Sequence, residues 1–194
     1  MAKVIGITGL LASGKSTLVK YILEQSYRVF DSDFEVGKLY NDSTFLNEVK
    51  NIFPKAFVNN TINKKILAEE IFSDENKKLS LEGLIHPIIE VKLNNFIKNN
   101  QNQKIIFIDV PLLFEVKWYK KCHEIILVIT NEENSLKRFI NRGGQPHMFN
   151  KIISNQTDLK YKIENSTHII ENNESLENFY NKIDKVLEKI KNTK

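Results

Sequence analysis

The stretch Gly9-Leu10-Leu11-Ala12-Ser13-Gly14-Lys15-Ser16 decides the fold, because it matches the phosphate-binding pattern GxxxxGK[ST] in full. A β-branched apolar run at 3–9 precedes it and predicts a buried strand, and an apolar pattern at helical spacing follows over 15–25. Its two glycines let the loop curl until backbone N–H groups and the helix N-terminus face an anion. Lys15 is then placed to reach the β- and γ-phosphates of a nucleotide, and the Ser16 hydroxyl to ligate Mg²⁺.

The order of segments around this loop predicts an α/β fold with a five-stranded parallel sheet. Further short apolar runs at 27–30, 104–109, 124–129 and 168–170 indicate strands, and the opening strand–loop–helix–strand is a βαβ unit. Residues 34–100 carry apolar side chains at helical spacing instead. That is too much helix for one crossover, so we expect an inserted helical subdomain.

Composition places the chain in a broad class. With 194 residues and 41% hydrophobic residues, it fits one domain carrying inserted parts. The single cysteine, Cys122, cannot form an internal disulfide, and no apolar run is long enough to span a membrane. We therefore expect a cytoplasmic protein. The net charge of +4 comes mainly from scattered lysines without a compact basic block, so we expect no nucleic-acid partner.

Carboxylates at two strand ends are candidates for the chemistry. Asp109 directly follows a predicted strand, where a carboxylate would help to organise Mg²⁺, although it could instead cap the turn before Pro111. Asp31 and Asp33 lie near the end of the second strand. We favour Asp33 as the general base that takes a proton from the acceptor, and either residue could instead cap the next helix.

Two arginines stand out in a chain that almost always uses lysine. Arg138 and Arg142 lie four residues apart and lead into the pair Gly143-Gly144. A guanidinium is a planar fork that suits phosphate, so both are candidates for a clamp on the transferred group. The glycine pair predicts the hinge of a lid. The alternative is that both arginines are solvated residues on a helix surface.

The motifs together resemble dephospho-CoA kinases. The resemblance rests on the P-loop, Asp31-Ser32-Asp33, Leu84-Ile85-His86-Pro87 and the run Asp109-Val110-Pro111-Leu112-Leu113-Phe114-Glu115. It implies transfer of the ATP γ-phosphoryl group to the 3′-hydroxyl of dephospho-CoA, with Mg²⁺ and without an obligatory protein partner. It also implies a three-layer P-loop kinase fold with core 1–33, 101–135 and 160–194, a CoA-binding helical insert 34–100 and a lid 136–159.

The same resemblance implies roles for particular residues. ATP would be held by Ala12, Ser13, Gly14, Lys15, Ser16, Thr17, Arg138 and Asn172, the last near the adenine. Asp33, His86 and Leu112 would bind the acceptor, and Arg142 would act with Lys15 and Asp33 in catalysis. Plainer roles remain open for three of these: His86 could end a turn, Asn172 could cap the last helix and Leu112 could belong to the core.

The sequence also departs from the family pattern. Leu10 and Ala12 stand where the family usually has glycine, and Ile152 stands where the lid usually has an arginine, four residues before Gln156. A usual aspartate is replaced around Ser166-Thr167. These changes concern the phosphate loop, the lid and the adenine pocket. Two other functions fit a P-loop: a kinase for another small hydroxyl acceptor, and a nucleotide-gated switch with little turnover.

Overall fold

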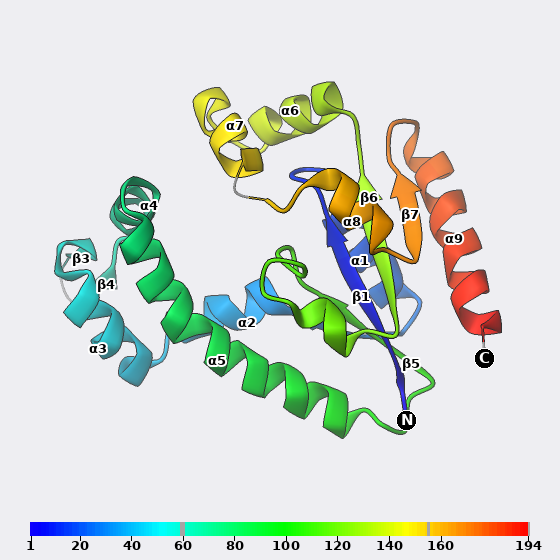
Figure 1. The fold of residues 1–194 in the computed structure, drawn as a ribbon, viewed down its shortest axis with the longest axis horizontal. Helices are drawn as coiled ribbons and strands as arrows, with labels where there is room; N and C mark the ends of the chain where they lie inside the picture. The colour runs from blue at the N-terminus through cyan, green and yellow to red at the C-terminus, as the bar shows by residue number, and fades with distance from the viewer. Residues whose placement is uncertain (59–60, 155, 194) are drawn as a thin grey trace. The chain divides into compact units, whose positions relative to one another are not determined.

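β1 (Lys3–Gly9) lies at the centre of a five-stranded sheet in this computed structural model, which describes residues 1–58, 61–154 and 156–193. The strand order is β2-β5-β1-β6-β7, with β2 at Arg28–Asp31, β5 at Ile105–Asp109, β6 at Glu124–Ile129 and β7 at His168–Glu171. β1 pairs in parallel with β5 and β6, and β6 pairs in parallel with β7 (Figure 1). The predicted parallel five-stranded sheet is confirmed. Its carboxyl ends share one edge, so loops distant in sequence meet there.

The chain divides into two units, Met1–Phe30 with Ile97–Lys194, and Asp31–Phe96. Among the described residues, the first unit contains the sheet and the helices α1 (Lys15–Glu24), α6 (Glu132–Asn141), α7 (Pro146–Ser154), α8 (Leu159–Glu164) and α9 (Leu176–Asn192). It also holds a short 3₁₀ helix, η2, at Trp118–Lys121. The unit boundaries fall close to the expected insert at 34–100. That the insert binds the acceptor stays a prediction, and so does the lid at 136–159.

One face of the sheet is covered by α1 and α9. Ile5 and Ile7 of β1 are fully buried there, together with Phe107 of β5 and Ile126 of β6. The helices contribute apolar stripes to the same cluster: Leu18, Val19, Ile22, Phe179, Ile183, Val186, Leu187 and Ile190. Burial of large apolar side chains is the main favourable term in folding. The strand before the phosphate loop and the helix after it are thus fixed in one rigid core.

The other face of β1 receives the segment that follows β5. At Gly6, a Cβ would lie 2.7 Å from Cys122 Sγ and 2.9 Å from Leu113 Cδ2, so only glycine allows this segment to pack so closely. Leu113 and Phe114 are buried, whereas Leu112 is 37% exposed. The alternative that Leu112 is a core residue is therefore wrong, and the core begins with the two residues after it.

The second unit is mainly helical. It contains α2 (Ser32–Leu39), α3 (Ser43–Ile52), the 3₁₀ helix η1 (Pro54–Ala56), α4 (Lys64–Ser73) and most of α5 (Glu75–Asn99). Two-residue strands β3 (Phe57–Val58) and β4 (Thr61–Ile62) pair antiparallel between α3 and α4. The sequence did not predict this pair, because two residues are too few to show a strand period. Within the described ranges, no helix combines the length and apolarity that a membrane crossing requires.

Candidate active site

The P-loop leaves the carboxyl end of β1 and ends at Gly14, the residue that caps α1. Gly14 has φ 104°, in the left-handed region, and no side chain caps the helix. The N–H groups of Lys15 and Ser16 begin the helix and have no partner within it, so they suit an anion, whereas the Thr17 N–H donates to the Gly14 carbonyl at 2.9 Å. Ala12 also has a positive φ, 52°, which is uncommon for a residue with a side chain. This geometry fits the glycine that the family usually has there.

Side chains from helix α6 and from the end of β7 form hydrogen bonds to carbonyls of the loop. Ser135, the fourth residue of α6, donates from its hydroxyl to the Leu11 carbonyl at 2.5 Å. Asn172, which follows β7, donates from Nδ2 to the Ser13 carbonyl at 2.8 Å. Arg138 donates from Nη1 to the same Ser13 carbonyl at 3.3 Å. The loop is therefore braced by residues more than 120 positions away in sequence.

Lys15 and Asp109 form an ion pair at the centre of the site. Lys15 Nζ lies 2.6 Å from Asp109 Oδ1 and 2.8 Å from Oδ2, and the two side chains are 18% and 7% exposed. The pair follows from the register, because Asp109 lies opposite Ile7 of β1 at the edge where the loop begins. The structure thus brings together the P-loop lysine and the carboxylate predicted to organise the metal.

The residues predicted to ligate Mg²⁺ have suitable chemistry. Ser16 is exposed in the first turn of α1, and Asp109 provides a carboxylate. Hydroxyl and carboxylate oxygens are the donors that Mg²⁺ takes, usually with waters and substrate phosphates completing the shell. Among the described residues, no group of three or more acidic, histidine or cysteine side chains forms a protein-only cage. The donor set fits a metal held jointly with nucleotide phosphates.

The two arginines lie in different surroundings. The Arg138 guanidinium bonds inside the protein, with Nη1 at Ser13 O and Nη2 donating to the Asn172 carbonyl at 3.0 Å. Arg142 is the exposed residue that ends α6, directly before Gly143 with φ 85°. Arg142 thus has the solvent access that a lid residue needs. The ATP contacts predicted for Arg138, Arg142 and Asn172 stay predictions.

The second strand ends in a helix cap. Asp31 accepts a hydrogen bond from the Phe34 N–H at 2.9 Å and is the N-cap of α2. Asp33 is exposed in the first turn of that helix. The alternative that one of this pair caps the next helix is therefore confirmed for Asp31, which leaves Asp33 as the candidate base. Asp33 belongs to the second unit, and its catalytic role stays a prediction.

His86 lies inside α5, one residue before Pro87, and the helix continues through both residues to Asn99. The alternative that His86 ends a turn is wrong. Asn172 does not cap α9, because Ser175 is the N-cap and accepts from Asn178 N–H. Binding of the acceptor by His86 and Leu112 stays a prediction.

A cavity of about 680 Å³ adjoins the P-loop in the first unit. Its walls come from Leu10, the loop between β6 and α6, the end of α7 and residues 156–159. Leu10 therefore adds an apolar side chain to the cavity at a position where the family usually has glycine. The cavity lies between the phosphate loop and part of the predicted lid.

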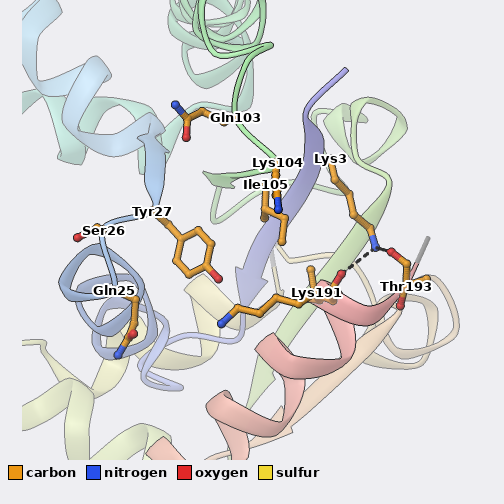
Figure 2. Close-up of a pocket in the computed structure, with 10 residues that line it drawn as sticks. Lys3, Gln25, Ser26, Tyr27, Gln103, Lys104, Ile105, Lys191 and Thr193 are labelled. Carbon is orange, nitrogen blue, oxygen red and sulfur yellow. Dashed lines mark hydrogen bonds between the residues drawn. The ribbon is translucent and has the colours of Figure 1, made fainter.

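A second cavity, of about 780 Å³, lies at the opposite edge of the sheet (Figure 2). It is lined by the ends of α1 and α9 and by three lysines, Lys3, Lys104 and Lys191. Lys3 donates to the Ile190 and Thr193 carbonyls, both at 3.2 Å. Lysines at helix C-termini satisfy terminal carbonyls and oppose the negative end of the helix dipole. Lys3 thus has a structural role at this edge of the sheet.

Sequence reasoning missed one buried ion pair near the site. Lys162 of α8 is completely buried, with Nζ 3.0 Å from Glu115 Oε1, and the same oxygen accepts from the Thr157 N–H at 2.7 Å. Burial raises the pKa of Glu115, but the Thr157 N–H and the Lys162 ammonium outweigh it and hold that pKa below its usual range. Glu115 thus ties the segment after β5 to the segment after α7. In the sequence, Glu115 was marked only by its position at the end of the run 109–115.

Comparison with known proteins gives a consistent result. The family model for dephospho-CoA kinases matches residues 3–178. Dephospho-CoA kinase from Fusobacterium nucleatum is 35% identical over 193 residues, covering 96% of this chain and 98% of the relative. The Listeria innocua enzyme of that name is 31% identical over 200 residues, with 100% of both chains covered.

Solved structures agree with the sequence matches. A Thermus thermophilus protein superposes with a TM-score of 0.84 at 28% identity, covering 97% of each chain. Dephospho-CoA kinase from Campylobacter jejuni gives 0.72 at 25% identity, covering 98% of each chain. A shikimate kinase from Acinetobacter baumannii shares only the fold, with a TM-score of 0.60 at 13% identity, covering 98% of this chain and 93% of the other.

Proposed function

The chain belongs to the dephospho-CoA kinase family, which catalyses the last step of CoA synthesis, and we propose that its P-loop holds the ATP for this reaction. The acceptor is the 3′-hydroxyl of dephospho-CoA, and the products are CoA and ADP. The observation that carries the proposal is the bidentate pair of Lys15 with Asp109 beside an uncapped helix N-terminus. It supplies a cation for phosphate and an anion for a metal at one point.

In this proposal the P-loop residues act mainly by position and charge. The N–H groups of Ala12, Gly14, Lys15 and Ser16 would face the β- and γ-phosphates, and the Lys15 ammonium would offset charge on the transferred group. Ser16 and Asp109 would hold Mg²⁺, which supplies charge stabilisation at the phosphates when bound. Arg142 would add a bidentate contact when the lid covers the nucleotide.

The second unit would supply Asp33 and His86 to the acceptor side of the reaction, and the first unit would supply Leu112. Asp33 accepts the proton of the acceptor hydroxyl as the hydroxyl oxygen bonds to the γ-phosphorus. At the same time, the bond between the γ-phosphorus and the oxygen that bridges it to the β-phosphate breaks. His86 and Leu112 would hold dephospho-CoA.

We place the enzyme in the cytoplasm, since its only cysteine, Cys122, requires no oxidising compartment. Its small-molecule partners are ATP and dephospho-CoA, and no protein partner is needed for this chemistry.

The test is ADP release from Mg-ATP with dephospho-CoA, adenosine, AMP, shikimate, gluconate or no acceptor. We expect stimulation by dephospho-CoA alone. Stimulation by another acceptor instead would reject dephospho-CoA as the substrate but would leave the P-loop assignment intact. Slow hydrolysis that no acceptor accelerates would favour a nucleotide-gated switch.

A further inference from the structure

We propose that Asn172 and Ser135 are positioning residues that aim the N–H groups of the P-loop at the nucleotide phosphates. This inference rests on the proposed function of the loop in holding ATP. It gives Asn172 a different role from the adenine contact that the family resemblance implies. Neither side chain needs to touch the nucleotide, because each acts through the backbone of the loop.

The planar peptide bond links the direction of each carbonyl in the loop to the direction of the next N–H. In a trans peptide, the carbonyl and the N–H of the same unit point in opposite directions. Asn172 Nδ2 holds the Ser13 carbonyl at 2.8 Å, so the Gly14 N–H of that unit points away from Asn172. The Ser135 hydroxyl holds the Leu11 carbonyl at 2.5 Å, which directs the Ala12 N–H in the same way. Two alternate peptides of the loop are thus fixed from behind.

Close packing between Asn172 and the P-loop requires glycine at position 14. A Cβ on Gly14 would lie 2.2 Å from Asn172 Nδ2, and the φ of 104° already disfavours any side chain. Asn172 therefore occupies the space that the missing Cβ leaves. The glycine of the P-loop pattern is needed here for contact with a residue 158 positions further along the chain, as well as for backbone shape.

Asn172 is itself held firmly. Its N–H donates to the Ile129 carbonyl at 2.9 Å, and its carbonyl accepts from Arg138 Nη2 and from the Thr130 hydroxyl, both at 3.0 Å. It is 8% exposed, and Ser135 is 4% exposed. Donors held in place before the ligand arrives cost little reorganisation, which is how oriented backbone groups stabilise developing charge. The ends of β6 and β7 thereby set the shape of the anion site.

The experiment compares the affinities of two probes, ADP and inorganic pyrophosphate, by calorimetry in the full-length protein. The variants are Asn172→Ala and Ser135→Ala. Asn178→Ala is the matched control, because the Asn178 side chain is exposed on α9 and donates to Glu174 Oε2 at 2.9 Å, away from the loop. Loss of one hydrogen bond that orders the loop should lower the affinity for both probes by roughly fivefold to tenfold in each variant. The control should change either affinity by less than about twofold.

Pyrophosphate lacks adenine, so it separates the two roles of Asn172. A loss of ADP affinity with unchanged pyrophosphate affinity in Asn172→Ala would overturn the proposal and favour an adenine contact. Unchanged pyrophosphate affinity in Ser135→Ala would also overturn it, and this variant keeps a good helix former in α6 should Asn172→Ala fold poorly. Dephospho-CoA turnover by the wild-type protein is a separate measurement. Its absence would reject the proposed function without changing this comparison of affinities.

Discussion

Replacement of Asp109 by asparagine isolates the charge that faces Lys15. Asparagine has nearly the same shape but cannot pair with the ammonium that lies 2.6 Å and 2.8 Å from the two carboxylate oxygens. Breaking a fully buried pair costs about 3–5 kcal/mol. Lys15 is 18% exposed, and the amide oxygen can still accept one hydrogen bond, so about 2 kcal/mol is the expected loss of unfolding free energy. That corresponds to a melting temperature lower by roughly 4–8 °C.

The same change has opposite effects on two nucleotide affinities. Without metal, ADP should bind Asp109→Asn at least as tightly as wild type, because Lys15 is released from its carboxylate and one negative charge is gone. With Mg²⁺, the gain in affinity that the metal gives wild type should largely disappear, and kcat should fall by roughly 100-fold or more.

The assay is ADP titration with Mg²⁺ and with a chelator, together with steady-state turnover. Asp184→Asn is the matched control, since Asp184 lies on α9 and accepts from the Tyr21 hydroxyl at 2.7 Å, an interaction that an amide oxygen can replace. If Asp109→Asn keeps both the Mg²⁺ enhancement and a kcat within about threefold of wild type, the assignment of Asp109 to the metal is wrong.

Further predictions concern Asp33, the Lys162–Glu115 pair and Cys122. Asp33→Asn should lower kcat by roughly 10²- to 10⁴-fold while the Kd for ADP stays near the wild-type value, and near-normal turnover would reject Asp33 as the base. Lys162→Met should lower the free energy of unfolding by about 3 kcal/mol through an unpaired Glu115, and the double variant with Glu115→Gln should recover much of it in urea melts. Because the pKa of Glu115 is lowered in the fold, its stabilisation is present above its unfolded pKa and lost as pH falls through the lowered value. The double variant should therefore lose less stability between pH 5 and pH 3 than wild type, and equal losses would contradict this reasoning. Burial raises the pKa of Cys122 to about 12, so iodoacetamide at pH 8 should alkylate it on the order of 1,000-fold more slowly than an unperturbed thiol, and equal rates would contradict the burial.

The P-loop and the carboxylate beside it were predictable because both depend on local order along the chain. A β-branched strand, a glycine-containing loop and a helix fix where Lys15 lies. Strand ends in a parallel sheet share one edge, so a carboxylate directly after a strand, such as Asp109, was expected near Lys15. The five strands followed from the same short-range patterns.

The supports of the loop were not predictable from pattern alone. Which backbone carbonyl Arg138 or Asn172 contacts depends on how β6 and β7 align, and no local signal encodes that alignment. The bonds from Arg138 and Asn172 to the Ser13 carbonyl were therefore not predicted, and the ATP contacts expected of both residues stay predictions. Ser135 gave no signal at all, since a serine in an amphipathic helix is ordinarily solvated. The two-residue strands of the second unit were too short to detect.

The most direct test of the central claim is identification of the phosphorylated product. The protein is incubated with Mg-ATP and dephospho-CoA, and CoA and ADP are quantified by mass spectrometry in the wild type and in Lys15→Ala. The account predicts one CoA for each ADP in the wild type, with transfer nearly abolished in Lys15→Ala. ADP formed without CoA, or CoA formed at the wild-type rate by Lys15→Ala, would contradict it.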